Sequence, residues 1–294
     1  MAVSPAVVTL FSAKVLKNLD PSHVWTEGCN TNYEGEIKGK GDVLKIFSVP
    51  RPTPANYVVG TNMTYERLRP SAITLTIDQD KAWAIQEDDL ERQLSRVKSF
   101  DELAINGAWA LADLAEVFLS ELMASQAAIT YTSQIVGNGA GNKSAYDLIV
   151  EIVTAIKETA KVAPMGMHAF IPFWFYAKLL LDQRFTGSNT AAARLTLRGE
   201  RIGVLENVTI HETSNALDSA GTGQDTDGPV NTIIVCSDKA TTWGRHIPEE
   251  GMVQYLDNKT NHDGYDNRMR ARYVFGGTVV YPQLIAKCVV TKGN

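Results

Sequence analysis

The chain has 294 residues, of which 44% are hydrophobic and 21% charged, so it can form a packed core and is not expected to be disordered throughout. Its net charge of −5, without a Lys/Arg run, argues against a dedicated nucleic-acid-binding protein. The cysteines, Cys29, Cys236 and Cys288, are too few and too scattered for a disulfide framework or a Cys-x-x-Cys metal site, and we interpret them as free thiols. No secretory signal pattern and no run of about 20 apolar residues occurs, so we expect neither export nor a membrane span.

The first 31 residues are weakly patterned. Residues 11–19 have the spacing of a short amphipathic helix, which Asp20 and Pro21 end. Phe11 and Trp25 are the candidate anchors of this arm. Trp25 is either an anchor in the core of its own chain or an anchor between subunits.

The segment from residue 32 to residue 93 is the most distinctive part of the chain. Residues 32–46 and 73–85 alternate polar and apolar side chains with period two, which predicts two strands with one covered face. Four prolines and Gly60 between them predict a bent connection. An arm of about 14 residues spans on the order of 45 Å, more than a compact domain of this size needs. We therefore predict a hairpin that lies on a neighbouring copy of the chain. Viewed in a single chain, the apolar side chains of this hairpin should be exposed: Leu44, Ile46, Ile73, Leu75 and Ile77.

Helices are predicted next. Asp88 or Asp89 can cap a short helix that ends near Val97. Residues 99–102 form a capping-box pattern, and apolar residues then recur at helical spacing, which predicts a helix of about 40 Å over residues 100–128. Gly107 is a weak point in this helix or a place of close backbone approach. Residues 135–142 form a Gly/Asn loop that lacks the Lys-Ser/Thr of a phosphate-binding loop, and we interpret it as a seam between two lobes.

The second half mixes both types of element. Residues 144–147 cap another amphipathic helix, and residues 167–171 form a short apolar strand that Pro172 separates from a helix over residues 173–181. Further strands are predicted over residues 204–212, 231–237, 273–281 and 284–290. Because strands and helices occur in clusters rather than in strict alternation, we expect an α+β fold.

The sequence carries few signals of catalysis or metal binding. No Gly-x-Ser-x-Gly or His-Glu-x-x-His motif occurs. Neighbouring residues on a strand point to opposite faces, so the pair His211-Glu212 cannot easily bind one ion. His262-Asp263 lies in a polar stretch that is more simply a solvated loop. We predict no catalytic residue, metal or cofactor.

Two segments resemble the extended loop of the major capsid proteins of tailed bacteriophages. The first runs from Tyr33 through Lys38 to Val43. The second runs from Leu75 through Trp83 to Gln93 and leads into the long helix. The short motifs are weak individually, but their order along nearly the whole chain is similar to that of this family.

The resemblance implies the tailed-phage capsid fold, which encapsulin-type shells share. It implies an N-terminal arm (1–31), an extended loop (32–86), a peripheral domain with a spine helix (87–135 and 273–294) and an axial domain (136–272). Intersubunit contacts are then expected from the loop residues Tyr33, Glu34, Lys38, Lys40, Leu44, Ile46, Arg51, Tyr57, Tyr65, Arg67, Arg69, Ile73, Leu75 and Ile77. Some relatives link subunits through a Lys–Asn isopeptide bond. Lys38, Lys40 and Lys45 lie in the right region, but we do not predict the bond.

The functional hypothesis is a structural shell protein. Hexamers and pentamers of this chain would tile an icosahedral shell around double-stranded DNA, with a portal, a separate scaffolding protein and, as an open question, decoration proteins as partners. The expected location is the virion capsid, assembled in the host cytoplasm, with no membrane contact. The alternatives are an encapsulin-like nanocompartment shell and a soluble α+β enzyme or ligand-binding protein with its site at residues 137–141 or at His262-Asp263.

Overall fold

The computed structural model describes residues 24–33, 37, 40–48, 50, 52–54, 56, 59–60, 62, 65–88, 99–137, 141–161, 166–182, 202–205, 208–221, 223, 228–246, 253–256 and 266–293. The described helices are η2 (Trp25–Gly28), α3 (Ser99–Gln126), α4 (Ala145–Ala160), α5 (Phe173–Leu180) and η4 (Pro282–Leu284). The described strands are β1 (Val43–Ser48), β2 (Ser71–Thr76), β3 (Gln79–Asp88), β4 (Ile129–Val136), β5 (Met167–Pro172), β6 (Ile202–Leu205), β7 (Val208–Thr213), β8 (Val230–Ser237), β9 (Thr241–His246), β10 (Val253–Leu256), β11 (Asp266–Val279) and β12 (Ile285–Lys292).

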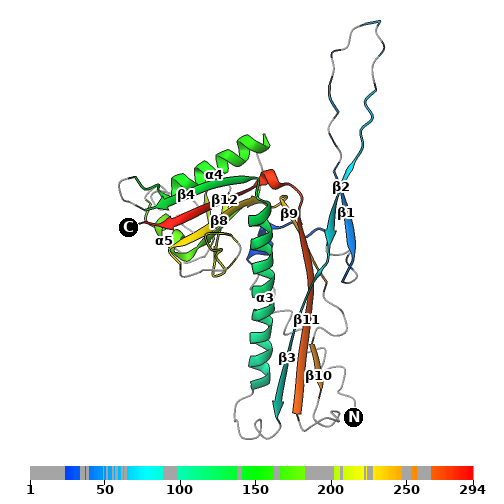
Figure 1. Cartoon of the computed structure of the whole chain (residues 1–294), viewed down its shortest axis with the longest axis vertical. Helices are drawn as coiled ribbons and strands as arrows, with labels where there is room; N and C mark the ends of the chain where they lie inside the picture. Colours follow the sequence, from blue (N-terminus) through cyan, green and yellow to red (C-terminus); the bar gives the residue numbers. More distant parts are fainter. Residues whose placement is uncertain are drawn as a thin grey trace.

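One lobe is built on a six-stranded sheet in the order β4-β12-β8-β5-β7-β6 (Figure 1). Helix α4 packs on β4 and β12, and α5 packs on β5 and β7. The predicted cap of α4 is confirmed, because the Ser144 side chain accepts a hydrogen bond of 3.2 Å from the Tyr146 N–H. Strand β8 is buried at almost every position, which agrees with the apolar run from Ile233 to Cys236 at its centre.

The other lobe is long and narrow. Strands β3, β10 and β9 all pair with β11, and α3 runs along the sheet they form (Figure 1). The buried positions of α3 recur every three or four residues, so one helix face packs on the sheet: Ala108, Leu111, Ala112, Ala115, Leu119 and Met123. At Gly107 the close neighbour is the Trp83 ring of β3 rather than another backbone. The predicted spine helix is therefore confirmed, and a single core connects both lobes.

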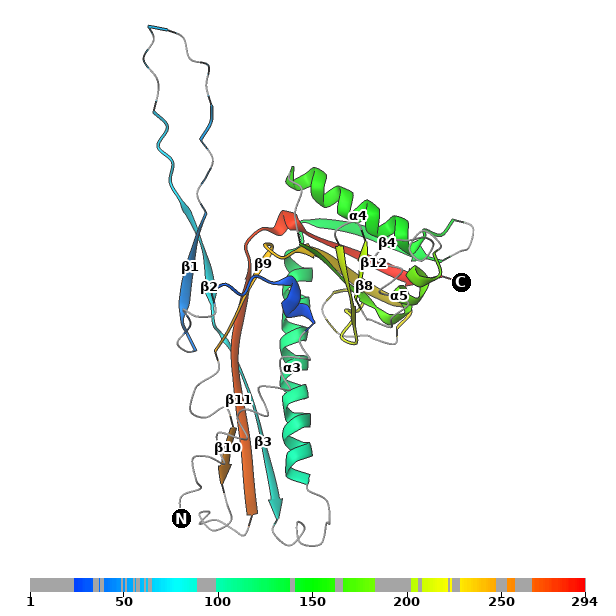
Figure 2. The ribbon, with the colours of Figure 1, turned by 180° about the vertical axis from the view of Figure 1, so that it is seen from behind.

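Strands β1 and β2 form an antiparallel pair that packs on β11 near its base, and the hairpin beyond it projects away from both lobes (Figure 2). Their register pairs Val43 with Thr76 and Ser48 with Ser71. Because the paired part has six residues in each strand, the prediction of arms of about 14 residues is wrong. Residues 79–85, which we placed in the second arm, belong to β3 and pair with β11.

Other differences come from long-range pairing. The predicted strand over residues 204–212 is two antiparallel strands, β6 and β7. β11 begins at Asp266, before the predicted start at residue 273. β12, predicted to lie with the spine helix, is instead in the interior of the six-stranded sheet, between β4 and β8. Strands β4, β9 and β10 were not predicted, and the predicted helix over residues 11–19 lies outside the described residues.

Candidate functional site at the projecting hairpin

The inner face of the hairpin is covered by its own chain. Leu75 and Ile77 are fully buried against Ile37 and Val274, and Leu44 and Ile46 pack on this cluster. Ile73 is half-buried. The prediction that Leu75 and Ile77 are exposed in a single chain is therefore wrong. Their cover comes from β11 and from the segment before β1, which the local alternation could not reveal.

Two glycines allow this close packing. A Cβ at Gly276 of β11 would overlap the Thr76 carbonyl oxygen and lie 2.9 Å from the Ile77 Cα. A Cβ at Gly244 of β9 would overlap the end of the Ile37 side chain. The hairpin thus leaves the long sheet at a point where two backbones touch.

Charged side chains fix the base of the hairpin. Arg272 donates two hydrogen bonds to the Asp80 carboxylate, at 2.7 and 2.6 Å, and Lys40 donates a third at 3.1 Å. The Arg272 guanidinium is the main cause that lowers the pKa of Asp80 to about 2, with a smaller contribution from Lys40. Lys40, expected in an intersubunit contact, is therefore paired within its own chain.

On the outer face of the hairpin, the side chains of β1 are exposed to solvent. Val43 is 54% exposed and Phe47 66%, and Lys45 lies between them on the same face. The cross-strand partners of this row are Thr76, Thr74 and Ala72. Phe47 was not among the predicted contact residues, although it is in phase with Val43 and Lys45. The exposed face of the hairpin is thus opposite to the face that we predicted to be exposed.

The far end of the hairpin carries further exposed apolar side chains. Val59 is 87% exposed and Tyr65 94%, and Leu68 lies further along the returning chain. Arg67 and Arg69 are also exposed. Other residues expected in the contact lie outside the described part of the chain: Glu34, Lys38, Arg51 and Tyr57. Phe11 of the N-terminal arm also lies outside it.

Trp25 anchors the N-terminal segment in its own chain. Its side chain is 1% exposed and stacks on Phe170 of β5 with ring centroids 4.1 Å apart. The Val24 N–H donates a hydrogen bond of 2.8 Å to the Glu116 carboxylate on α3. Asn30 then pairs with β9, because its N–H donates to the Thr241 carbonyl and its carbonyl accepts from the Trp243 N–H. The contacts of Trp25 are those of a core anchor.

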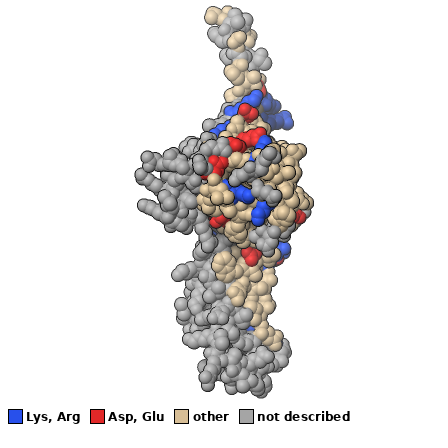
Figure 3. Space-filling model, turned by 90° about the vertical axis from the view of Figure 1, so that its left-hand side faces the viewer, with Lys and Arg blue, Asp and Glu red and all other residues tan. Residues whose placement is uncertain are grey.

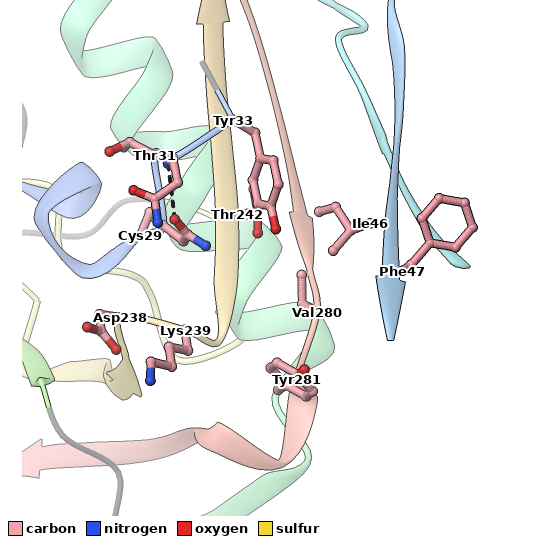
Figure 4. A pocket seen from close by; sticks show the side chains of 12 residues that line it. Cys29, Thr31, Tyr33, Ile46, Phe47, Asp238, Lys239, Thr242, Val280 and Tyr281 are labelled. Carbon is pink, nitrogen blue, oxygen red and sulfur yellow. Dashed lines mark hydrogen bonds between the residues drawn. The ribbon is translucent and has the colours of Figure 1, made fainter. Parts of the chain in front are cut away.

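A cavity of about 430 Å³ lies between this segment, the hairpin and the turn that joins β8 and β9 (Figure 4). Tyr33, Ile46 and Lys239 are among its lining residues. Its wall mixes polar and apolar groups. Among the described residues, no group of three or more His, Cys, Asp or Glu side chains could hold a metal ion. His262 and Asp263, the alternative site, lie outside the described residues.

The described surface and helices give no further site. Acidic and basic side chains are intermixed on the face seen in Figure 3. No helix in the described part of the chain is long and apolar enough to cross a membrane.

Comparisons with known proteins identify the fold. No protein-family model and no curated protein sequence matches the chain. A solved structure from Mycobacterium phage Che8 is similar with a TM-score of 0.68 and 23% identity, over 90% of each chain. The mature capsid of bacteriophage PhiM1 is similar with a TM-score of 0.62 and 13% identity, over 90% of this chain and 88% of the other. A virus-like particle from Pyrococcus furiosus gives 0.56 and 11%, over 94% and 96%. The chain has the α+β fold of the major capsid proteins of tailed bacteriophages.

Proposed function

We propose that this chain is the structural subunit of an icosahedral shell, and that the outer face of its hairpin binds a neighbouring subunit. The observation that carries the proposal is a projecting hairpin with unpaired apolar side chains, in a chain that shares its fold with phage capsid structures over almost its whole length. Exposed apolar side chains such as Phe47 and Tyr65 on a projecting hairpin are typical of a surface that binds another protein.

Burial of the hairpin on a neighbour supplies a driving force for assembly. Transfer of one large apolar side chain out of water contributes about 1.5–3 kcal/mol before the costs of association are subtracted. Val43, Phe47, Val59 and Tyr65 together therefore form a sizeable contact surface. Because the hairpin and the surface that receives it differ, the contact is heterologous and repeats around a ring. Hexameric and pentameric rings of this kind would then tile the shell.

In this proposal the parts of the chain keep the roles that the sequence suggests. Residues 1–31 form the N-terminal arm and 32–86 the extended loop, 87–135 and 273–294 the peripheral domain, and 136–272 the axial domain. These boundaries need adjustment. β3, β9 and β10 all pair with β11 in the long sheet, whereas β4 and β12 pair in the six-stranded sheet.

The partners follow from the same proposal. The shell encloses double-stranded DNA, and the net charge of −5 suits a wall that encloses nucleic acid without binding it tightly. A portal and a scaffolding protein are separate chains. The subunit acts by assembly rather than by catalysis, and its place is the virion capsid, built in the host cytoplasm.

The likeness to a virus-like particle favours one second candidate, an encapsulin-like shell without packaged DNA. The two candidates differ in their contents. Particles isolated from the natural source and treated with nuclease would retain protected double-stranded DNA if the chain is a phage capsid protein. They would retain no DNA if it forms an encapsulin-like shell.

The experiment is expression of the full chain followed by negative-stain electron microscopy. We expect rings or closed shells. A variant that lacks residues 50–70 should give folded subunits that assemble poorly, because it lacks the far end of the hairpin. Normal shells from this variant would refute the bridging role of the hairpin. Failure of the full chain to assemble, with or without a co-expressed scaffold, would refute the shell function.

A point variant tests the outer face more finely. Phe47→Ser removes an exposed side chain, so the free subunit should change its stability by less than about 0.5 kcal/mol while assembly weakens. Thr74→Ser, on the same face, is the matched control and should assemble normally. Equal assembly of both variants would contradict a contact through Phe47.

A further inference from the structure

Two histidines lie against each other where the N-terminal segment meets the six-stranded sheet. The Nδ1 atom of His168 on β5 is 2.9 Å from the Nε2 atom of His211 on β7. The other ring nitrogen of His211, Nδ1, is 3.3 Å from a carboxylate oxygen of Glu27 in η2. The side chain of His211 is 3% exposed, whereas that of Glu27 is half-exposed. A buried ring therefore connects the N-terminal segment to β5.

Aromatic rings extend this connection to Trp25. Phe170 stacks on Trp25 on one side and on His211 on the other, with centroids 4.1 and 5.2 Å apart. His211 in turn stacks on His168 at 5.2 Å. A Cβ at Gly28 would lie 2.8 Å from the Phe170 ring, so η2 is tightly fitted against the stack. A change of charge on either histidine thus acts directly on the packing of the N-terminal segment.

Two neutral histidines satisfy this arrangement. When His168 carries its proton on Nδ1, it donates to the Nε2 atom of His211, and the Nδ1 proton of His211 points to the Glu27 carboxylate. Protonation of both rings places a donor on each of the two facing nitrogens. It then removes the hydrogen bond and brings two positive charges together in a buried site.

The other charged groups around the pair act less directly. Asp238, after β8, faces His168 and favours its charged form. Cys236 lies beneath η2, and burial raises the pKa of its thiol to about 12, so it stays neutral. Glu212 follows His211 on β7, where alternation points its side chain to the opposite face. On the other side of η2, Glu116 of α3 accepts from the Val24 N–H, with Asp113 beside it.

We propose that Glu27, His211 and His168 form an acid-sensitive clasp that holds residues 24–30 on the body of the subunit and releases them when the histidines become charged. This segment leads toward the hairpin and lines the cavity beside Ile46 (Figures 2 and 4). Release of this segment would therefore open the cavity beside the hairpin. The clasp is a property of the single chain and does not depend on shell assembly.

The direction of the effect follows from the pKa values. Burial, with a smaller contribution from His168, lowers the pKa of His211 from 6.5 to about 4, and burial also lowers that of His168. A lowered histidine pKa means that docking is strongest at neutral pH and weakens as the pH falls below 6.5. Burial raises the pKa of Glu27 and Glu116, so these carboxyl groups favour docking in acid and partly offset the loss.

The test is hydrogen exchange at the amides of Asn30 and Trp243, which the docked segment protects. The full chain is labelled at pH 7.5 and pH 5, with labelling times scaled to the intrinsic exchange rates. If undocking restores the ordinary pKa of His211, the fraction of chains with the segment undocked rises about 30-fold from pH 7.5 to pH 5. This figure leaves out the opposing effect of the Glu27 and Glu116 carboxyl groups. Amides of β8 are expected to show no such rise.

His211→Gln removes the titrating ring and should reduce this rise to a few-fold. His168→Gln removes the smaller contribution to the lowered pKa of His211 and leaves the burial, so it should reduce the rise in part, and it serves if the first variant does not fold. His246→Gln, a matched substitution on β9, should retain the rise of the original chain. The clasp is overturned if the original chain shows no acid-dependent exchange at Asn30, or if both clasp variants respond to pH as the original chain does.

Discussion

Gly276 is the position at which a single methyl group should disturb the hairpin. Gly276→Ala places a Cβ against the Thr76 carbonyl oxygen and the Ile77 Cα. Both neighbours are backbone atoms, so no change of rotamer relieves the overlap. Overpacking of this kind lowers the free energy of unfolding by about 1–3 kcal/mol. Alanine also restricts the unfolded chain more than glycine does, which raises the free energy of unfolding by about 0.5–1 kcal/mol. We expect a net loss of about 1–2 kcal/mol or a displaced hairpin base.

The next residue on β11 is the matched control. A Cβ at Gly277 faces α3 instead, 3.1 Å from the Leu122 Cδ2 and 3.4 Å from the Phe118 ring. These are side-chain atoms that can shift by a few tenths of an ångström. Gly277→Ala should therefore change the free energy of unfolding by no more than about 0.5 kcal/mol.

The assay is urea unfolding of dissociated subunits, together with electron microscopy of assembly. We expect Gly276→Ala to be the less stable variant and to assemble poorly, while Gly277→Ala behaves like the original chain. Equal stability and equal assembly of the two variants would refute the inference that backbone contact at Gly276 positions the hairpin.

Three further variants test other contacts, each by urea unfolding. Trp25→Ala should destabilise the subunit by about 3–5 kcal/mol, since it removes a large buried ring; a loss below about 1 kcal/mol would show that the ring is not a core anchor. Gly107→Ala should be neutral or destabilising despite the higher helix propensity of alanine, because the new Cβ meets the Trp83 ring; a gain of about 1 kcal/mol would contradict this contact. Asp80→Asn should cost less than about 1 kcal/mol, and 1 M salt should reduce the difference, because Arg272 and Lys40 are each about half exposed to solvent. If salt did not change the stability difference between Asp80→Asn and the original chain, an ion pair at Asp80 would be contradicted. In the original chain the stabilisation by this ion pair is present above pH 4 and is lost as the pH falls toward 2, since the pKa of Asp80 is lowered.

Elements whose signals are local could be predicted from the sequence. The spine helix has a capping pattern and an apolar stripe on one face, and α3 begins at Ser99, one residue before the predicted start. The same holds for α4 with its cap at Ser144 and for the short β5 before Pro172. In each case neighbours within a few residues determine the structure.

Features that depend on distant residues could not be predicted. Alternation correctly placed Leu75 and Ile77 on one face of the hairpin, but it could not reveal that Val274 covers that face. For the same reason β3 was joined to the hairpin, because its partner β11 lies almost 200 residues further along the chain. The acidic partner of His211 is Glu27 rather than its neighbour Glu212, and no sequence signal links residues so far apart.

The central claim is that the outer face of the hairpin binds a neighbouring subunit in a shell. A cryo-electron microscopy reconstruction of the assembled particles, at a resolution that shows side chains, tests this claim most directly. We expect Val43, Phe47 and Tyr65 of each subunit to be buried on the next subunit of the ring. Particles in which these side chains face solvent, or preparations that contain only monomers, would contradict it.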